Sequence, residues 1–391
     1  MLRFARVVGM EPLLPRYGAG ALSDVVPSLL AGMGVPGAVD VLGISGAARV
    51  CVLLVDGLGW ELLREHADAA PFLSSLARGR EAITAGFPSS TATSVAALGT
   101  GLPTGEHGIV GYTFAAVGAD GEELVNALSW QRHTGQGDLR SVLVPEEVQP
   151  TPTAFERAAE AGVLVKVLAS WAFQGSGLTR AVLRGGEFVG AHALGDLVSG
   201  VASALRERDR VLCYAYHADL DALGHGHGPG SESWVAQLSV VDRLAELISE
   251  RLPEGGALVV TADHGMVRVT DRVDFDQEPG LREGVRLLGG EPRVRHVHVE
   301  PGAEDAVRAR WTAVLGERAW VVSRAEAIEA GWFGPRVADH VRPRVGDLVV
   351  AARGGAVVIR SAAEPLLSVF PGHHGSLTAA EQLVPLLVST R

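Results

Sequence analysis

The segment AITAGFPSSTATSVAALGTGLPTGEHGIVGY, residues 82–112, predicts a short strand, a loop and a helix in succession. An apolar run ends at Phe87-Pro88, two serines and Thr91 follow, and small residues at helical spacing continue to Leu98. A hydroxyl in the first turn of a helix lies close to unpaired backbone N–H groups and to the positive end of the helix dipole. Thr91 is therefore either a helix cap, a common role for Thr, or a nucleophile placed to attack a phosphate.

Acidic residues and histidines follow four further apolar, strand-like runs of the chain. They are Asp56 after 52–55, Asp219, Asp221 and His225 after 211–216, Asp263 and His264 after 257–260, and His373 and His374 after 369–370. Open α/β sheets bind ligands beyond the carboxyl ends of their strands, so we expect these side chains at one rim of a sheet. A mixture of carboxylate oxygens and imidazole nitrogens suits zinc or a similar first-row divalent ion.

In this order and spacing, the motifs resemble the alkaline phosphatase superfamily, and most closely its type I phosphodiesterase/nucleotide pyrophosphatase family. The matching pieces are Asp56 in VDGLGW, Thr91 in FPSSTATS with Gly101 ten positions on, Asp221-x-x-x-His225, Asp263-His264-Gly265-Met266 and His374-Gly375. They extend over residues 50–375, which is nearly the whole chain. A sulfatase of the same superfamily would need a Cys/Ser-x-Pro-x-Arg site, and neither Cys51 nor Cys213 has one.

The resemblance implies a site for two divalent metal ions, with zinc expected and manganese or another first-row ion as the alternative. It assigns Asp56, Thr91, Asp263 and His264 to one ion, and Asp221, His225 and His374 to the other. The spacing agrees, because Asp263 and His264 are adjacent and a helical turn brings Asp221 and His225 to one side. The resemblance also implies that Thr91 is the catalytic nucleophile, forming a phosphothreonine that water then cleaves, while the two ions stabilise the attacking and leaving oxygens.

Several neighbouring residues compete for these roles. Asp219 lacks the four-residue spacing to His225 that Asp221 has, and the ten-residue distance to Gly101 favours Thr91 over Ser89, Ser90 and Thr93. His227 and His373 are each either further ligands or, more commonly for such positions, substrate contacts or loop residues.

One departure from the family concerns the substrate. Related phosphodiesterases commonly carry an Asn a few residues after the HGI segment, whereas residues 107–110 are followed here by Gly111-Tyr112. The side chain of Tyr112 or the backbone would have to contact the phosphate instead. The candidate aromatic residues of a substrate pocket are Tyr112, Phe114, Trp171 and Phe173, and packing in the core is an equal alternative for them.

The fold expected from these patterns is α/β, with a mostly parallel, alkaline phosphatase-like central sheet flanked by helices. Core strands are expected near 49–55, 164–170, 211–216 and 257–262, and a core-packing helix over 231–251. Residues 1–267 and 346–391 form the expected metallo-phosphoesterase core. Residues 268–345 lack ligand candidates that the family supports, and we expect an inserted smaller α+β subdomain there, a candidate lid. A returning hairpin over 346–360 and a final helix over 378–387 complete the expectation.

Composition limits the partners. The 391 residues are 47% hydrophobic and 20% charged, which indicates a globular chain, and a net charge of −11 argues against binding to long nucleic acid. A small anionic phosphate ester remains suitable, because bound metal ions make a site locally positive. Residues 1–18 contain charges and prolines where a signal peptide has an apolar core, so a soluble cytoplasmic protein without a membrane segment is expected. The oligomeric state is left open.

The resulting hypothesis is a metal-dependent hydrolase of phosphodiester or pyrophosphate bonds in nucleotide-like small molecules. A phosphomonoesterase or a phosphonate C–P hydrolase would use the same metals and nucleophile, and assays on a monoester and a diester would separate them. A catalytically inactive metal-binding module is the remote alternative.

Overall fold

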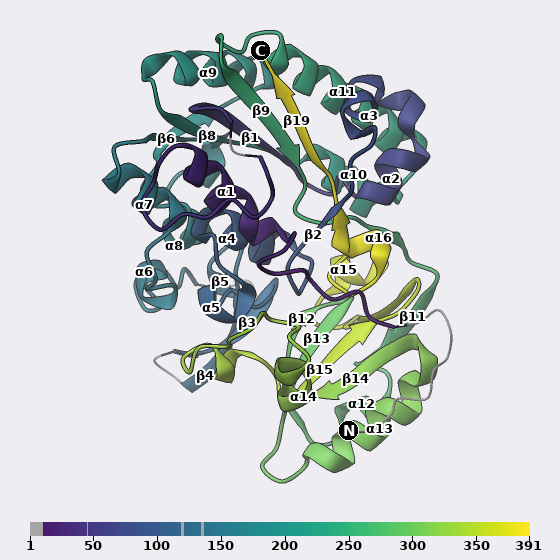
Figure 1. The fold of residues 1–391 in the computed structure, drawn as a ribbon. Coiled ribbons are helices and arrows are strands. Elements are labelled where there is room, and N and C mark those ends of the chain that lie inside the picture. Colours follow the sequence, from purple (N-terminus) through teal and green to yellow (C-terminus); the bar gives the residue numbers. More distant parts are fainter. Residues whose placement is uncertain (1–10, 45, 119–120, 134–136) are drawn as a thin grey trace.

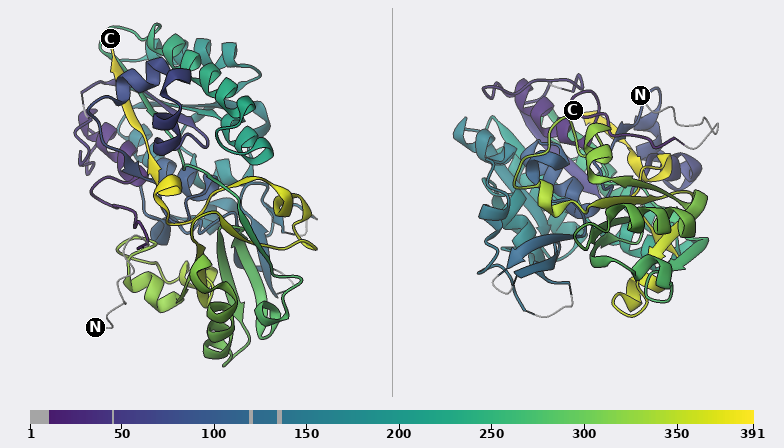
Figure 2. Two further views of the ribbon diagram at one scale, coloured as in Figure 1. Left: turned by 90° about the vertical axis from the view of Figure 1, so that its right-hand side faces the viewer. Right: turned by 90° about the horizontal axis from the view of Figure 1, so that it is seen from below.

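The computed structural model describes residues 11–44, 46–118, 121–133 and 137–391. Figure 1 shows two lobes, a larger one above with the main sheet and a smaller one below with a second sheet. The chain crosses between the lobes more than once, and the C-terminal strand β19 returns to the upper lobe (Figures 1 and 2).

The main sheet is parallel except at one edge. Its order is β19-β9-β1-β8-β6-β7, and only β19 runs antiparallel, to β9. The strands are β1 (Arg49–Val55), β6 (Leu164–Ser170), β7 (Glu187–Ala191), β8 (Val211–His217), β9 (Gly256–Thr261) and β19 (Leu386–Thr390). Every residue of β9 is buried, which is typical of a parallel strand covered on both faces and explains why these strands read as unbroken apolar runs. The predicted α/β fold and its core strands are confirmed.

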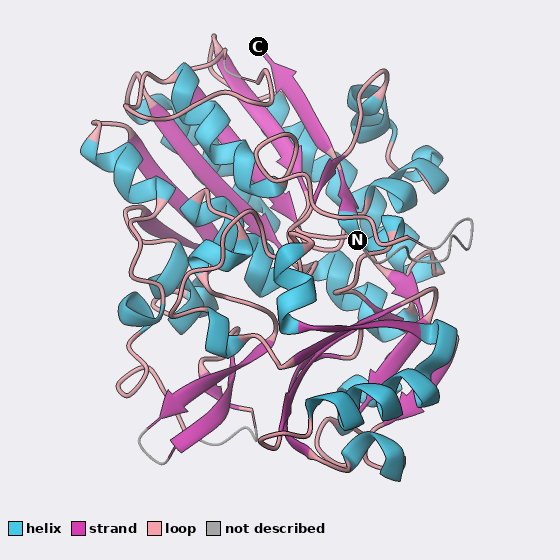
Figure 3. Cartoon of the chain, turned by 60° about the horizontal axis from the view of Figure 1, so that its bottom comes forward, coloured by secondary structure: helices cyan, strands magenta, loops and turns pink. Residues whose placement is uncertain are grey.

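Helices cover both faces of this sheet (Figure 3). One face carries α9 (Leu194–Glu207) and α11 (Glu232–Ser249), which also contact each other, and the other carries α1 (Val25–Gly32), α4 (Thr91–Thr100) and α7 (Ala154–Glu160). The core-packing helix predicted over 231–251 is therefore confirmed as α11. The remaining helices of this lobe are α2 (Trp60–Glu65), α3 (Pro71–Ala77), α5 (Thr104–His107), α6 (Pro145–Val148), α8 (Gly177–Val182), α10 (Asp219–His227) and α16 (Ala379–Gln382).

The second sheet is antiparallel, in the order β12-β13-β15-β14. Its strands are β12 (Val285–Glu291), β13 (Val294–Val299), β14 (Ala319–Ser323) and β15 (Leu348–Ala352), accompanied by α12 (Pro279–Arg282), α13 (Glu304–Leu315), α14 (Arg324–Glu329) and α15 (Pro365–Val369). The buried ring of Trp311 on α13 belongs to an apolar cluster separate from that of the main sheet. In this sheet β15 lies between β13 and β14. The sequence analysis ended the inserted unit at residue 345, so one central strand of the sheet lies beyond that boundary.

Short strand pairs join distant segments. They are β2 (Ile83–Thr84) with β18 (Leu383–Val384), β10 (Val267–Arg268) with β17 (Gly372–His373), and β11 (Asp271–Asp274) with β16 (Ala356–Ile359). A local three-stranded ribbon consists of β3 (Thr113–Gly118), β4 (Gly121–Asn126) and β5 (Gln131–Arg132). Within the described ranges, no helix is both long and apolar enough to cross a membrane.

Two predictions about the C-terminal part were wrong. The helix expected over 378–387 is a single turn, α16, because Pro385 cannot continue a helix and the β-branched and apolar residues after it pair with β9 as β19. The hairpin expected over 346–360 does not form either, because β15 pairs with β13 and β14 whereas β16 pairs with β11.

Two buried ion pairs fasten β13 and the residue before it to the C-terminal segments. Arg293 Nε and Nη2 lie 2.9 and 2.6 Å from the carboxylate oxygens of Glu381, and Arg295 makes the same bidentate contact with Glu364 at 3.0 and 2.6 Å. His133 Nε2 lies 3.0 Å from the same Glu364 carboxylate. Burial raises the pKa of Glu364, but Arg295 and His133 more than offset this and hold the pKa at about 2.

Glu364→Gln should lower the free energy of unfolding at pH 7 by about 3–5 kcal/mol, because it leaves Arg295 buried without its counter-charge. The folded pKa of about 2 lies below the usual 4.5, so the wild-type carboxylate contributes fully above pH 4.5 and loses ~3 kcal/mol as the pH falls towards 2. In urea titrations, the difference in unfolding free energy between the wild type and the variant should therefore become smaller as the pH is lowered. Glu283→Gln, at a glutamate that is 75% exposed, is the control and should change little. A gap independent of pH would contradict this prediction.

Candidate active site

The sequence-predicted ligands meet at the carboxyl ends of the central strands. Asp56 follows β1, Asp221 and His225 lie on α10 directly after β8, and Asp263 and His264 follow β9. Thr91 is the first residue of α4. His374 belongs to the C-terminal part of the chain and directly follows β17. Parallel pairing of β1 with β8 and β9 brings the first three of these segments to one edge of the sheet.

The first group of side chains surrounds His264. Its Nε2 lies 3.4 Å from Asp56 Oδ1, 3.4 Å from Asp263 Oδ2 and 3.3 Å from Thr91 Oγ1. The second carboxylate oxygen of Asp56 accepts a hydrogen bond from the hydroxyl of Tyr216, and that of Asp263 accepts from Gly57 N at 3.1 Å. Each carboxylate is thus held on one side and directs its other oxygen towards the same point.

The second group lies beside the first. His225 Nε2 is 3.4 Å from Asp221 Oδ2 and 3.2 Å from His374 Nε2, and His374 Nε2 is 3.8 Å from Asp221 Oδ1. The rings of His374 and His264 stack, with their centroids 3.5 Å apart and their planes 9° from parallel. The two groups therefore share a wall, and their composition matches the two sets of ligands that the resemblance implied.

The backbone fixes the tautomers of the three histidines. The Nδ1 atoms of His225, His264 and His374 lie 2.8, 3.0 and 3.0 Å from the carbonyl oxygens of Gly372, Gly265 and Ser89. A carbonyl oxygen only accepts, so Nδ1 carries the proton and Nε2 has a free lone pair. Imidazoles in this arrangement are suited to bind a metal through Nε2.

Three buried carboxylate oxygens that face these nitrogens have no hydrogen-bond partner. They are Asp56 Oδ1, Asp221 Oδ1 and Asp263 Oδ2. Burial raises the pKa of Asp221 and of Asp263 to about 7, and it lowers the pKa of His264 to about 3. Converging lone pairs, orphaned carboxylate oxygens and the chemistry of the donor set all fit divalent cations, which would favour the charged carboxylates and the neutral imidazoles.

Thr91 is the hydroxyl that faces this cluster. Ser89 Oγ donates to Ser376 O at 2.8 Å, Thr93 Oγ1 donates to Ile109 O at 3.1 Å, and Ser90 Oγ lies 3.3 Å from Thr93 Oγ1. These three hydroxyls are buried and have structural partners, whereas Thr91 is half-buried beside His264. Ser90, not Thr91, occupies the N-cap position of α4.

The other competing residues do not join the two groups, although His373 lines one of the cavities beside them. Asp219 is 69% exposed and lies near His217 rather than in the cluster, and His227 is exposed. His373 is buried, with its Nε2 2.8 Å from Leu367 O. The four-residue spacing to His225 therefore predicted the right aspartate, because Asp221 and not Asp219 joins the cluster.

Two cavities open from the site and share Thr91, Leu128 and Asp221 in their walls. The first, of about 240 Å³, is mostly apolar, and its wall includes Phe173, whose ring lies 5.8 Å from that of Tyr216 in an edge contact. The second, of about 190 Å³, has more titratable side chains in its wall. Its wall contains Ser90, Ala92, Tyr112, His225, Glu291, Pro292, Leu367, Phe370, His373 and His374 besides the shared residues.

The four candidate pocket aromatics are therefore divided. Phe173 and Tyr112 each line one cavity. Phe114 is fully buried against Trp130, and Trp171 is 59% exposed beside His192. Neither is among the described residues of the two cavity walls.

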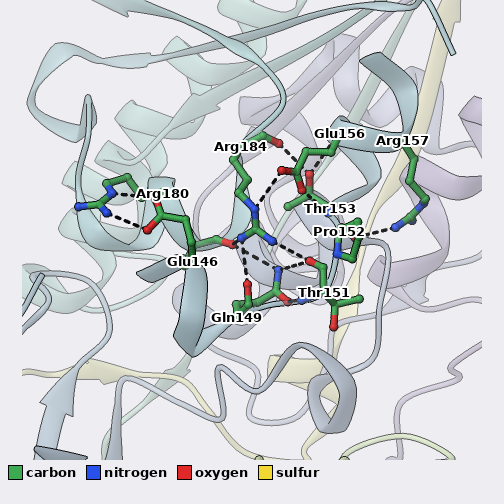
Figure 4. A network of polar contacts seen from close by, with 10 residues as sticks. Glu146, Gln149, Thr151, Pro152, Thr153, Glu156, Arg157, Arg180 and Arg184 are labelled. Atoms are coloured by element: carbon green, nitrogen blue, oxygen red, sulfur yellow. Dashed lines mark hydrogen bonds and ion pairs between the residues drawn. The ribbon is translucent and has the colours of Figure 1, made fainter. Parts of the chain in front are cut away.

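Helix α8 forms part of the wall of the apolar cavity, and a polar network supports this helix (Figure 4). Arg184, directly after α8, donates to Gln149 O at 3.0 Å and Thr151 O at 2.8 Å, and its Nε lies 3.1 Å from Glu156. Arg180 on α8 makes a bidentate contact with Glu146 at 2.9 and 2.7 Å. These contacts fix α8, which contributes Leu178 and Thr179 to the cavity, against α6 and α7.

Sequence reasoning missed two residues of the site. Tyr216 could have been found, because Tyr214 and Tyr216 alternate along a strand whose end carries ligands, which places both on one face. Glu291 gave no signal, because it lies at the end of β12 in the smaller lobe and reaches the site only through the packing of the two lobes.

Comparison with known proteins agrees with this site. The sequence model of the type I phosphodiesterase/nucleotide pyrophosphatase family matches residues 50–377, so the chain belongs to this family. The family consists of metal-dependent phosphoric ester hydrolases. The resemblance inferred from the sequence motifs is confirmed.

Solved structures share the fold. Murine ectonucleotide pyrophosphatase/phosphodiesterase 5 superimposes with a TM-score of 0.67 at 18% identity, covering 88% of each chain. Phosphonoacetate hydrolase from Sinorhizobium meliloti, in complex with phosphonoformate, gives a TM-score of 0.63 at 21% identity, covering 88% of this chain and 90% of that one.

A more limited likeness links the chain to phosphopentomutases. That of Anaeromyxobacter dehalogenans is 31% identical over 158 residues, which are 39% of this chain and only 38% of the mutase. That of Sinorhizobium medicae is 28% identical over 169 residues, 39% of this chain and 40% of the mutase.

Gly265→Ala should disturb the site through the backbone, because a Cβ at this position would lie 2.0 Å from Ala380 O and 3.0 Å from Gly59 Cα. We expect a loss of about 1–3 kcal/mol in unfolding free energy and weaker zinc binding, since His264 is the preceding residue. Gly195→Ala, in the open first turn of α9, is the control and should be neutral or slightly stabilising. Urea unfolding and zinc calorimetry test both variants, and wild-type behaviour of Gly265→Ala would refute this prediction.

Proposed function

We propose that this chain hydrolyses phosphodiester or pyrophosphate bonds in nucleotide-like small molecules through a covalent phosphothreonine on Thr91. The observation that carries the proposal is the position of Thr91 Oγ1, which lies 3.3 Å from His264 Nε2 and opens into both cavities. The first residue of a helix also leaves nearby backbone N–H groups free to hold a phosphoryl oxygen.

We assign Asp56, Thr91, Asp263 and His264 to one divalent ion, and Asp221, His225 and His374 to a second, with zinc preferred. Such ions, when bound, supply Lewis-acid charge that lowers the pKa of a hydroxyl and stabilises a leaving oxygen. The chain itself contributes the orientation. Tyr216 fixes the carboxylate of Asp56, and three backbone carbonyls fix the imidazoles.

The cavities support a substrate with one flat apolar group. Phe173, Tyr216 and Phe188 line the first cavity and offer an aromatic ring edge and face contacts. Among the solved structures with this fold is an inactive threonine-to-alanine variant of murine ectonucleotide pyrophosphatase/phosphodiesterase 5 in complex with AMP. A nucleobase or another aromatic group in the first cavity is consistent with that likeness.

The same site could also serve a phosphonate C–P hydrolase, and the likeness to phosphonoacetate hydrolase keeps this alternative in view. Phosphonoacetate carries a second acidic group. Among the described residues that line the two cavities, none is Lys or Arg. A second anionic group would therefore be buried without a counter-charge, which favours the ester substrate.

The smaller lobe takes part in substrate choice under this proposal. We place the inserted unit, residues 268–345, beside the site as a candidate lid, and Glu291 and Pro292 of this range line the second cavity. Replacing the unit with a short linker would remove part of that wall.

Thr91→Ala should reduce kcat on a nucleotide diester by roughly 10³-fold or more, because covalent catalysis needs its nucleophile, whereas Thr91→Ser should retain substantial activity. Thr93→Ala is the control, since its hydroxyl bonds Ile109 O instead of facing the cluster. With a substrate chiral at phosphorus, two successive displacements give net retention of configuration. Net inversion, or normal turnover by Thr91→Ala, would mean that water attacks directly.

Elemental analysis of purified protein should approach two metal ions per chain, and Asp221→Ala and Asp263→Ala should each retain about one. Each variant should also lose the part of the zinc-dependent stabilisation that the missing ion gives the wild type, about 2.7 kcal/mol at a hundredfold excess over Kd, because metal bound only to the folded state stabilises it. Asp219→Ala, at the exposed neighbour of Asp221, should keep both ions. Equal metal contents in all four proteins would refute the assignment.

A further inference from the structure

Glu291 brings an unassigned carboxyl group from the smaller lobe into the second cavity. It is the last residue of β12, its side chain is only 5% exposed, and its Oε1 has no hydrogen-bond partner. The same wall contains Thr91, Tyr112 and His374. A buried carboxyl oxygen that no side chain satisfies costs free energy unless a ligand supplies a donor.

The surroundings hold this side chain in place. Glu291 lines the same cavity wall as Ser90, the residue before Thr91. Gly375 makes room for it, because a Cβ there would lie 3.2 Å from both Cγ and Cδ of Glu291. The following turn is fixed by Arg293, which is fully buried in its ion pair with Glu381. The carboxyl group is therefore pre-positioned at the wall beside Thr91.

The neighbouring hydroxyls of the chain already have partners. The hydroxyl of Tyr112 bonds the side chain of Asn126, and that of Thr93 bonds Ile109 O. A donor for Oε1 must then come from what enters the cavity. A volume of about 190 Å³ corresponds to roughly six waters at ~30 Å³ each, so the entering group is compact.

We propose that Glu291 is a specificity-determining residue that accepts a hydrogen bond from a hydroxyl or ammonium group on a short alcohol esterified to the phosphate. This inference rests on the proposed function, and it names the chemical class of the second substituent of the phosphodiester substrate. The aromatic group of such a diester occupies the apolar cavity, and the short, donor-bearing alcohol occupies the cavity of Glu291. An alkyl group of the same size would leave Oε1 unsatisfied.

Calorimetric titration with 2-aminoethyl phosphate and propyl phosphate tests this, because the two ligands differ only by an ammonium in place of a methyl group. Zinc-loaded Thr91→Ala protein is used so that neither ligand turns over. We expect at least about tenfold tighter binding of 2-aminoethyl phosphate. In the added variant Glu291→Met the preference should fall below about threefold, with the affinity for propyl phosphate nearly unchanged.

Glu291→Gln preserves the shape and one acceptor oxygen of the side chain, so it should fold normally and show an intermediate preference. Glu283→Gln, on the same lobe but 75% exposed, should keep the full preference. An undiminished preference in Glu291→Met would overturn the proposal, and so would an equal loss for both ligands, which would place Glu291 against the common phosphoryl group. If both ligands bind without discrimination, only the role of Glu291 fails. If neither ligand nor inorganic phosphate binds, the proposed function fails with it.

Discussion

The constraint on which the rest of the structure depends is the burial of many lone pairs at one point. Three carboxylate oxygens without partners and three imidazole nitrogens converge there, with Thr91 beside them. Like partial charges in a low-dielectric interior repel, and burial alone opposes the charged form of each group. The described residues of the flanking cavity walls include no Lys or Arg, and divalent cations are the counter-charge that this donor set fits. The surrounding fold supports this arrangement by holding Asp56, Asp263 and the three histidines from behind.

The support for the site comes from both lobes. Glu381 connects the two lobes. Its carboxylate forms the ion pair with Arg293 of the smaller lobe, and it accepts a hydrogen bond from the backbone N–H of Ser376 at 2.9 Å. Its carbonyl oxygen accepts from Gly265 N at 2.9 Å. Gly265 follows His264 and Ser376 lies two residues after His374, so one buried glutamate sets the relative position of loops that carry ligands from both groups. The stacking of the His264 and His374 rings depends on these contacts of Glu381.

Under the proposed function, the division of the space around Thr91 into two cavities lets the site distinguish the two substituents of a phosphodiester. The core lobe builds the apolar cavity from β6, β8 and α8, and the Arg180 and Arg184 contacts hold α8 in place. The smaller lobe adds polarity to the second cavity through a single residue, Glu291. The Asn that related phosphodiesterases commonly carry after the HGI segment is replaced here by Gly111-Tyr112, and Tyr112 shares that second wall with Glu291. Under the proposed function, both lobes therefore contribute to substrate choice, the core through the apolar cavity and the smaller lobe through Glu291.

The sequence by itself determined the family, the α/β class, the core strands and the residues that converge at the site. It could do so because apolar runs mark buried parallel strands, and ligands placed directly after them must meet at one edge of the sheet. Tertiary structure alone decided that the residues on both sides of Pro385 became strands, because β18 pairs with β2 and β19 pairs with β9. It also decided that β15 belongs to the second sheet, that Phe114 and Trp171 lie outside the cavities, and that Glu291 lies inside one. Such outcomes depend on contacts between segments far apart in the chain, and local periodicity carries no information about them.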